Sequence, residues 1–178
     1  VSDRHDNILA DQLLRDVADA AGASFVMNLG DNTASGSSYE AFSLRSFNEA
    51  FKGMTIMVLI GNHDQGSYVK QYWKHEGAIV ASDKVVEYEG IRFILRDDYR
   101  TSDFTPERAI NDTTKDEMIN GITRLACDSD ERVDVALLPQ ASIGREALEK
   151  GCVTLVLGGD THQQTTLEEV VSEDRVPG

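Results

Sequence analysis

The sequence lacks any long apolar segment. None of its apolar runs approaches the roughly 20 residues that a membrane-spanning helix requires, and no secretory signal sequence is visible at its start. It also has no internal repeat, linker or low-complexity tract. Of its 178 residues, 40% are hydrophobic and 27% are charged, which is the composition of an ordinary folded protein. We therefore expect one domain over residues 1–178, with a sizeable core.

Basic residues are scarce. The chain has 17 lysine and arginine residues against 31 aspartate and glutamate residues, which gives a formal net charge of −14. Nucleic acid is not expected as a bulk partner, because a polyanion would be repelled. A small phosphate substrate remains compatible with this charge, because a bound cation can invert the local field.

Cysteine is nearly absent. Cys127 and Cys152 are the two cysteines of the chain, and their spacing is not that of a metal-binding motif. They can form one disulfide or remain as two buried thiols. We favour two thiols as the prediction, and the cellular compartment stays open.

Helical and strand patterns alternate along the chain, which predicts an α/β fold. Trp73 and the series Phe42, Phe47 and Phe51 have helical spacing and are predicted to lie in the core, whereas His75 is expected on a helix surface. Helices are predicted at 7–21, 37–53, 68–76, 113–127 and 143–150. Strands are predicted at 24–29, 54–60, 133–138, 153–157 and near 165–171, with a hairpin over 84–95 that turns at 89–90.

Polar side chains follow three of the expected strands, and also a first, truncated strand of which residues 1–3 read as the tail. The ligand crevice of an open α/β sheet lies beyond the carboxyl ends of its strands, so we expect these side chains to converge. A glycine just before several of them allows the sharp bend that this requires. Any one cluster by itself is most simply a turn, but four at successive strand ends favour a site. The residues are Asp3 and His5, then Asp31, then Asn62, His63 and Asp64, and finally Asp160 and His162.

Carboxylate, imidazole and amide ligands together suit a divalent cation such as Mn, Fe, Zn or Mg. Two such ions about 3.5–4 Å apart can hold the attacking and leaving oxygens of a phosphoryl transfer, and a water bound to such an ion can ionise near pH 7. In this interpretation Asn62 is a metal ligand. His63 donates a proton to the substrate, and Asp64 orients His63.

These motifs resemble those of the calcineurin-like metallophosphoesterases, which run D-x-H, G-D, G-N-H-D/E, a lone H and then G-H-x-H. The likeness covers nearly the whole chain. It implies a four-layer α/β/β/α sandwich with mixed sheets and a metal-dependent hydrolase of phosphomonoesters or phosphodiesters, which uses a metal-bound hydroxide. The chain would be one such domain, truncated at its first strand and at its C-terminal end.

The sequence is most similar to bacterial members whose phosphoesterase domain follows membrane-spanning helices. This implies an extracytoplasmic domain of a bacterial membrane protein, with a cytoplasmic location as the alternative. The domain itself is not expected to contact the membrane.

Carried over by position, the resemblance places one metal ion on Asp3, His5 and His162, with Asp31 shared between two ions. The second ion would take Asn62 and two further histidines, and both histidines are missing. Pro139 stands near one of these positions, followed by Gln140, and Asp160 stands at the other. The resemblance therefore implies one firm site and a weaker second site that prefers a hard ion.

Two functions remain open. The retained His63 and Asp64 favour a hydrolase that acts on a phosphate ester. The replacements at Pro139 and Asp160 favour a catalytically silent, metal-binding module that holds a phosphorylated ligand or a protein partner.

Overall fold

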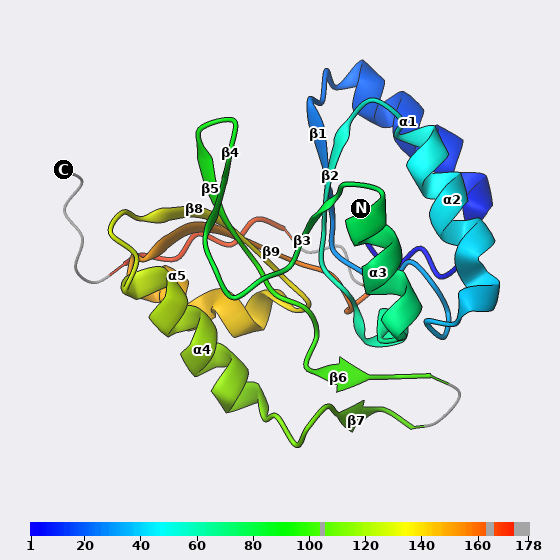
Figure 1. Cartoon of the computed structure of the whole chain (residues 1–178). Coiled ribbons are helices and arrows are strands. Elements are labelled where there is room, and N and C mark those ends of the chain that lie inside the picture. The colour runs from blue at the N-terminus through cyan, green and yellow to red at the C-terminus, as the bar shows by residue number, and fades with distance from the viewer. Residues whose placement is uncertain (104–105, 163–165, 173–178) are drawn as a thin grey trace.

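Two β-sheets form the centre of the molecule (Figure 1). The computed structural model describes residues 1–103, 106–162 and 166–172. The first sheet is parallel and consists of β1 (Phe25–Asn28), β2 (Thr55–Val58) and β3 (Ile79–Val80). The second has the order β4 (Val86–Tyr88), β5 (Ile91–Leu95), β8 (Val133–Leu138) and β9 (Val153–Gly158), and only its β4–β5 pair is antiparallel. A separate antiparallel ribbon joins β6 (Arg100–Thr101) and β7 (Arg108–Ala109).

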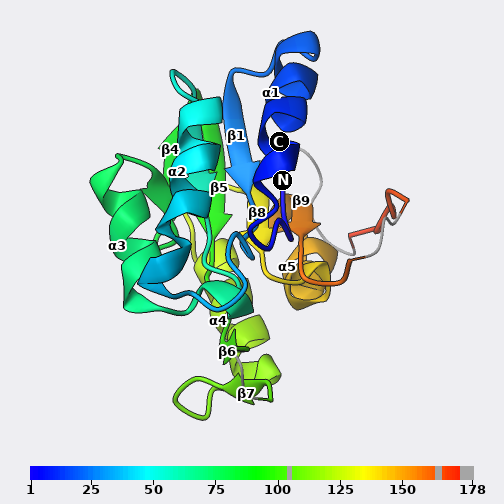
Figure 2. The ribbon, with the colours of Figure 1, turned by 90° about the vertical axis from the view of Figure 1, so that its right-hand side faces the viewer.

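Helices cover the outer face of each sheet (Figure 2). The first sheet packs against α1 (Asp11–Ala20), α2 (Ala41–Ala50) and α3 (Ser67–His75), and the second against α4 (Lys115–Cys127) and α5 (Arg145–Glu149). Short 3₁₀ turns are η1 (Ile8–Ala10), η2 (Ser38–Glu40), η3 (Asn62–Asp64) and η4 (Ala141–Gly144).

The two sheets also pack against each other, as alternate side chains of β2 show. Ile56 and Val58 lie in the cluster beneath the helices, whereas Met57 lies in a different cluster with Phe93 and Leu137 of the second sheet. Successive side chains of a strand point to opposite faces, so each sheet is buried on both sides. This arrangement confirms the predicted α/β sandwich, with helices outside and two layers of strands inside, of which the second is a mixed sheet.

Local sequence features explain several element boundaries. The predicted hairpin turns at Glu89 and Gly90, which both have left-handed φ angles of 53° and 74°. A two-residue hairpin turn requires this conformation, and it matches the twist of the flanking strands. Helix α4 begins after Thr114, whose Oγ1 accepts from Glu117 N at 3.2 Å while the Glu117 carboxylate accepts from Thr114 N at 2.8 Å. This reciprocal pair satisfies two otherwise unpaired backbone donors of the first turn.

The structure corrects two of the expectations for apolar residues. Residues 166–171 form no strand, and Leu167 and Val171 there are 80% and 89% exposed; Thr165 lies outside the described residues. A strand needs a neighbouring edge for its backbone hydrogen bonds, and this segment pairs with none that the structure describes. Phe42 is 47% exposed and lies outside the core, although Phe47 and Phe51 are buried as predicted.

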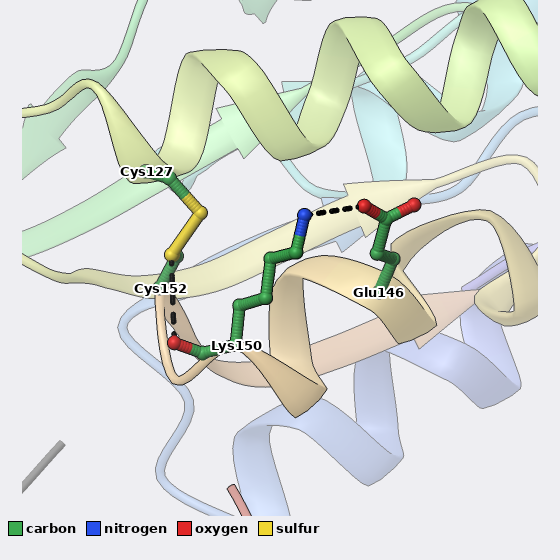
Figure 3. Close-up of a disulfide and its surroundings, with 4 residues drawn as sticks. All are labelled: Cys127, Glu146, Lys150 and Cys152. Carbon is green, nitrogen blue, oxygen red and sulfur yellow. Dashed lines mark hydrogen bonds and ion pairs between the residues drawn. A yellow bond between two sulfur atoms is a disulfide. The ribbon is translucent and has the colours of Figure 1, made fainter. Parts of the chain in front are cut away.

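The prediction of two free thiols was wrong. Cys127 at the end of α4 and Cys152 before β9 form a disulfide, with their Cα atoms 5.0 Å apart (Figure 3). It ties the last turn of the helix to the start of the edge strand that the helix covers. Lys150 and Glu146 form an ion pair of 2.6 Å beside it. Spacing in the sequence did not reveal the bond, because its two partners are 25 residues apart and meet only after α4 and α5 have packed on the sheet.

Within the described residues, no helix has both the length and the apolar character that crossing a membrane requires.

Reducing the disulfide should destabilise the fold. A cross-link between residues 25 apart restricts the unfolded chain, and its loss should lower the free energy of unfolding by about 2–4 kcal/mol. Urea denaturation with and without dithiothreitol measures this difference. The variant C127A/C152A is the control, because reductant should leave its midpoint unchanged. Equal midpoints for the oxidised and reduced wild-type protein would show that the bond does not stabilise the fold.

Candidate metal centre

The N-terminal segment brings Asp3 and His5 to the carboxyl end of the first sheet. Asp3 N donates to Gly30 O at 3.2 Å, and His5 N donates to Asp31 O at 2.9 Å, so the segment runs beside the loop that follows β1. Both residues have left-handed backbones, with φ of 55° and 42°. Non-glycine residues rarely adopt this conformation.

The same strained backbone recurs at the other strand ends. Asp31 has φ of 53°, Asp160 has 65° and His162 has 49°. Left-handed residues other than glycine cost about 1–3 kcal/mol each and cluster at functional sites. Their concentration here, on three separate segments, indicates that the fold holds these side chains in place against a local energetic cost.

Asp3, His5 and His162 form a compact cluster of metal-ligand atoms. One ligand atom from each of them lies within 4.8 Å of the others. The two Nε2 atoms of His5 and His162 are 3.3 Å apart, and His162 Nε2 is 3.2 Å from Asp3 Oδ1. Asp3 Oδ1 is buried and, among the described residues, has no hydrogen-bond partner of acceptable geometry. Three ligand atoms that converge on one point, one of them a buried oxygen without a hydrogen-bond donor, fit a divalent cation, although the His162 side chain itself is 61% exposed.

The protonation of His5 suits the same interpretation. Burial lowers the pKa of His5 below its usual value, and the neighbouring His63 lowers it further, against an opposing effect of Asp3. Neutral imidazole is the form that ligates metal. The structure therefore favours the form of His5 that this role requires.

Asp31 lies at the centre of the strand ends. Its side chain is buried, and burial raises its pKa to about 7; the backbone N–H of His63 opposes this shift, while Asp64 and Asp3 add to it. His63 N donates to Asp31 Oδ1 at 3.0 Å. A carboxylate held between two others without a cationic partner is costly to ionise, so a bound cation would favour its charged form.

The centre has two halves: the first consists of Asp3, His5, His162 and Asp31, and the second lies around Asp160. Asn62 joins Asp31 to the second half. In one orientation of its amide, the nitrogen donates to both Asp31 oxygens at 3.0 and 3.1 Å and to Asp160 Oδ1 at 3.3 Å. In the other orientation Nδ2 donates to Glu107 Oε2 at 3.3 Å, and the amide oxygen faces the two carboxylates. The first orientation satisfies these carboxylates without an ion. The structure thus brings Asn62, Asp31 and Asp160 together as the sequence predicted.

The environment of Asp160 differs from that of the first cluster. Its Oδ2 accepts a short hydrogen bond from Gln140 Nε2 and forms an ion pair with Arg100 Nη2 at 3.0 Å. Gln140 therefore presents its amide nitrogen to Asp160, not the amide oxygen that a metal ion would need. The residues of this half do not fit a second transition-metal ion.

The expected pairing of His63 with Asp64 was wrong. Asp64 is fully buried, and its carboxylate accepts from Asn32 N, Thr33 N and Thr33 Oγ1 at 3.1, 2.9 and 2.7 Å. His63 Nδ1 instead lies 2.9 Å from Ala34 O, to which it can donate. Asp64 thus connects two loops, and a backbone carbonyl orients His63.

His63 lies beside the cluster of metal-ligand atoms. Its ring centroid is 4.8 Å from that of His5, with the two rings perpendicular. With Nδ1 on Ala34 O, Nε2 is the ring nitrogen that can exchange a proton with a substrate.

Sequence reasoning missed Arg100 and Glu107. Both belong to the β6–β7 region, whose sequence contains no recognisable motif. The one local signal was the D-x-R spacing of Asp98 and Arg100, which is common in turns. Their importance follows from the position of the ribbon, where Ser102 N donates to Asn62 O at 2.8 Å.

The family model described as calcineurin-like phosphoesterase matches residues 1–164. No curated protein is similar enough in sequence to be counted as a match.

The variant Asp64→Asn should destabilise the protein. The amide would turn an NH₂ group toward donors that now share a carboxylate, so the free energy of unfolding should fall by about 2–4 kcal/mol. Urea denaturation of the metal-free protein measures the change. Asp16→Asn on the exposed face of α1 is the matched control and should cost less than about 0.5 kcal/mol. Equal effects of the two variants would contradict the buried linking role of Asp64.

Proposed function

We propose that this chain, which belongs to the calcineurin-like phosphoesterase family over residues 1–164, hydrolyses a phosphate ester with the help of a divalent metal ion. The observation that supports this most directly is the convergence of ligand atoms from Asp3, His5 and His162 within 4.8 Å. The buried Asp3 oxygen that lacks a hydrogen-bond donor supports the same proposal.

The first half of the centre would hold the ion through Asp3, His5, His162 and the carboxylate of Asp31. Its mixed nitrogen and oxygen donors suit Mn, Fe, Zn or Mg. When bound, such an ion polarises a phosphoryl oxygen and lowers the pKa of a water molecule. These ligands come from three separate segments, the N-terminal segment, the loop after β1 and the loop after β9, so they would fix the position of the ion relative to His63.

His63 would protonate the leaving group. In hydrolysis, the oxygen of water forms a bond to phosphorus and releases a proton to the solvent, the ester P–O bond breaks, and the leaving oxygen gains a proton. Nε2 of His63 can supply that proton while Nδ1 donates to the carbonyl of Ala34. The carbonyl keeps the ring in one orientation in both protonation states, since Nδ1 bears a proton in each of them.

A second candidate function is a silent module that holds a phosphorylated ligand or a protein partner. The observation in its favour is the half of the centre around Asp160, which Arg100 and Gln140 close with their own donors. A family member that needs two metal ions for turnover would lose activity through such a change.

A turnover assay separates the two candidates. The protein is assayed with an aryl phosphate monoester and an aryl phosphate diester, each with added Mg, Mn, Zn or Ca. A hydrolase should release phenol with at least one ion and lose the activity when a chelator is added. If no ion supports release and the protein still binds metal, the silent module is the better description.

The variant His63→Ala should lower turnover much more than it lowers metal affinity. A positioned acid contributes about 10²–10⁴ in rate, whereas the proposed ligands lie on other residues. Steady-state hydrolysis and metal titration of the same preparation measure the two effects. His75→Ala, on the exposed face of α3, is the matched control and should change neither. Unchanged turnover, or metal affinity that falls in parallel with turnover, would contradict the role of His63.

A further inference from the structure

The guanidinium of Arg100 lies among three carboxylates beside the centre. Its Nη2 is 2.7 Å from Asp98 Oδ2 and 3.0 Å from Asp160 Oδ2, and its Nη1 is 3.1 Å from Glu107 Oε2. The Arg100 side chain is 13% exposed, so it is held in this position by packing as well as by charge. The β6–β7 ribbon that carries it is fixed to η3 by the bond from Ser102 N to Asn62 O.

We propose that Arg100 takes the place of a second metal ion, so that the centre binds one divalent cation beside one built-in guanidinium. The metal-binding part of this inference does not depend on turnover; its relevance to catalysis rests on the proposed phosphoesterase function. The guanidinium of Arg100 would supply the positive charge that a second metal ion would otherwise bring to this half of the centre.

The acceptors in this half are matched by donors of the protein itself. Asp160 Oδ2 accepts from Arg100 and Gln140, and its Oδ1 accepts from the amide nitrogen of Asn62 when that amide is turned toward the carboxylates. Glu107 Oε2 forms an ion pair with Arg100 Nη1 as well. In the first half, by contrast, the buried Asp3 Oδ1 has no such partner among the described residues. A centre that binds a single ion would show this difference, with an oxygen that lacks a donor in the half that binds the ion and paired acceptors in the other half.

The charge of Arg100 is permanent. Burial alone lowers the pKa of Arg100, but its hydrogen bonds and ion pairs with Asp98 and Asp160 raise it above the ordinary arginine value. A divalent cation that used the oxygens of Asp160 would have to displace the guanidinium, whose Nη2 is 3.0 Å from Asp160 Oδ2, because two cations this close together in a partly buried site repel each other. Removing the charge should therefore open the oxygen-rich half to a hard ion.

Titration of the purified, metal-free protein with Mn²⁺ tests the proposal. Isothermal calorimetry should give one tight ion per wild-type chain, and electron paramagnetic resonance should show the signal of isolated Mn²⁺. In Arg100→Gln, a second ion should bind at least about tenfold more tightly than in the wild type, and the spectrum should show magnetic coupling between two ions. Arg100→Lys keeps the charge and should remain a one-ion protein.

Arg92→Gln is the matched control. Arg92 is also a partly buried arginine in an ion pair, with Glu131 at 2.7 Å, but it lies at the opposite end of β5 from the centre. The Arg92→Gln variant also removes one positive charge, and it should still bind one ion per chain. Two coupled ions in the wild type overturn the proposal whatever the fold of the variants, and so does one ion in a folded Arg100→Gln.

The outcomes also separate this inference from the proposed function. One ion in the wild type and two in Arg100→Gln support the inference even if neither protein hydrolyses an ester, and that result would count against the hydrolase alone. A wild-type protein that binds no ion contradicts both.

Discussion

The centre depends on the close packing of two strand-end loops. A Cβ atom on Gly30 would lie 2.6 Å from Gly61 N, and one on Gly61 would lie 2.2 Å from Asp31 Oδ1. The backbones after β1 and β2 can approach this closely only because both positions are glycine. Asp64 then holds the loops together through its buried bonds to Asn32 and Thr33. This contact sets the positions of Asp31, Asn62 and His63 relative to one another.

Local patterns in the sequence predicted the α-helices, the longer strands and the gathering of the polar residues, but not the two-residue strands β3, β6 and β7. Parallel strands end at the same edge of a sheet, so the residues that follow them converge whatever the loops do in detail. The partners of individual side chains could not be read in this way. The choice of Ala34 O over Asp64 by His63 depends on a loop 29 residues away, and the disulfide depends on helix packing. The sequence pattern of α1 predicted its helix correctly, yet Leu13 and Val17 on that helix are 65% and 59% exposed.

The two halves of the centre use different structural means to balance negative charge. In the first half, strained backbones bring ligand atoms together and leave a buried carboxylate oxygen without a donor. In the second half, the β6–β7 ribbon brings Arg100 to the acids, and the amides of Asn62 and Gln140 complete their hydrogen bonds. An aspartate at position 160 suits the guanidinium of Arg100 better than an imidazole would, because its carboxylate accepts a charge-assisted hydrogen bond.

The same charges bear on how any phosphate could approach. Asp3, Asp31 and Asp160 all lie at the centre, in a chain with a formal net charge of −14. Arg100 is already neutralised by three carboxylates and offers little net attraction. An anionic ligand would therefore be repelled until a cation occupies the first half of the centre. The same repulsion would act on a substrate and on a ligand that is only bound, so both candidate functions should require a bound cation.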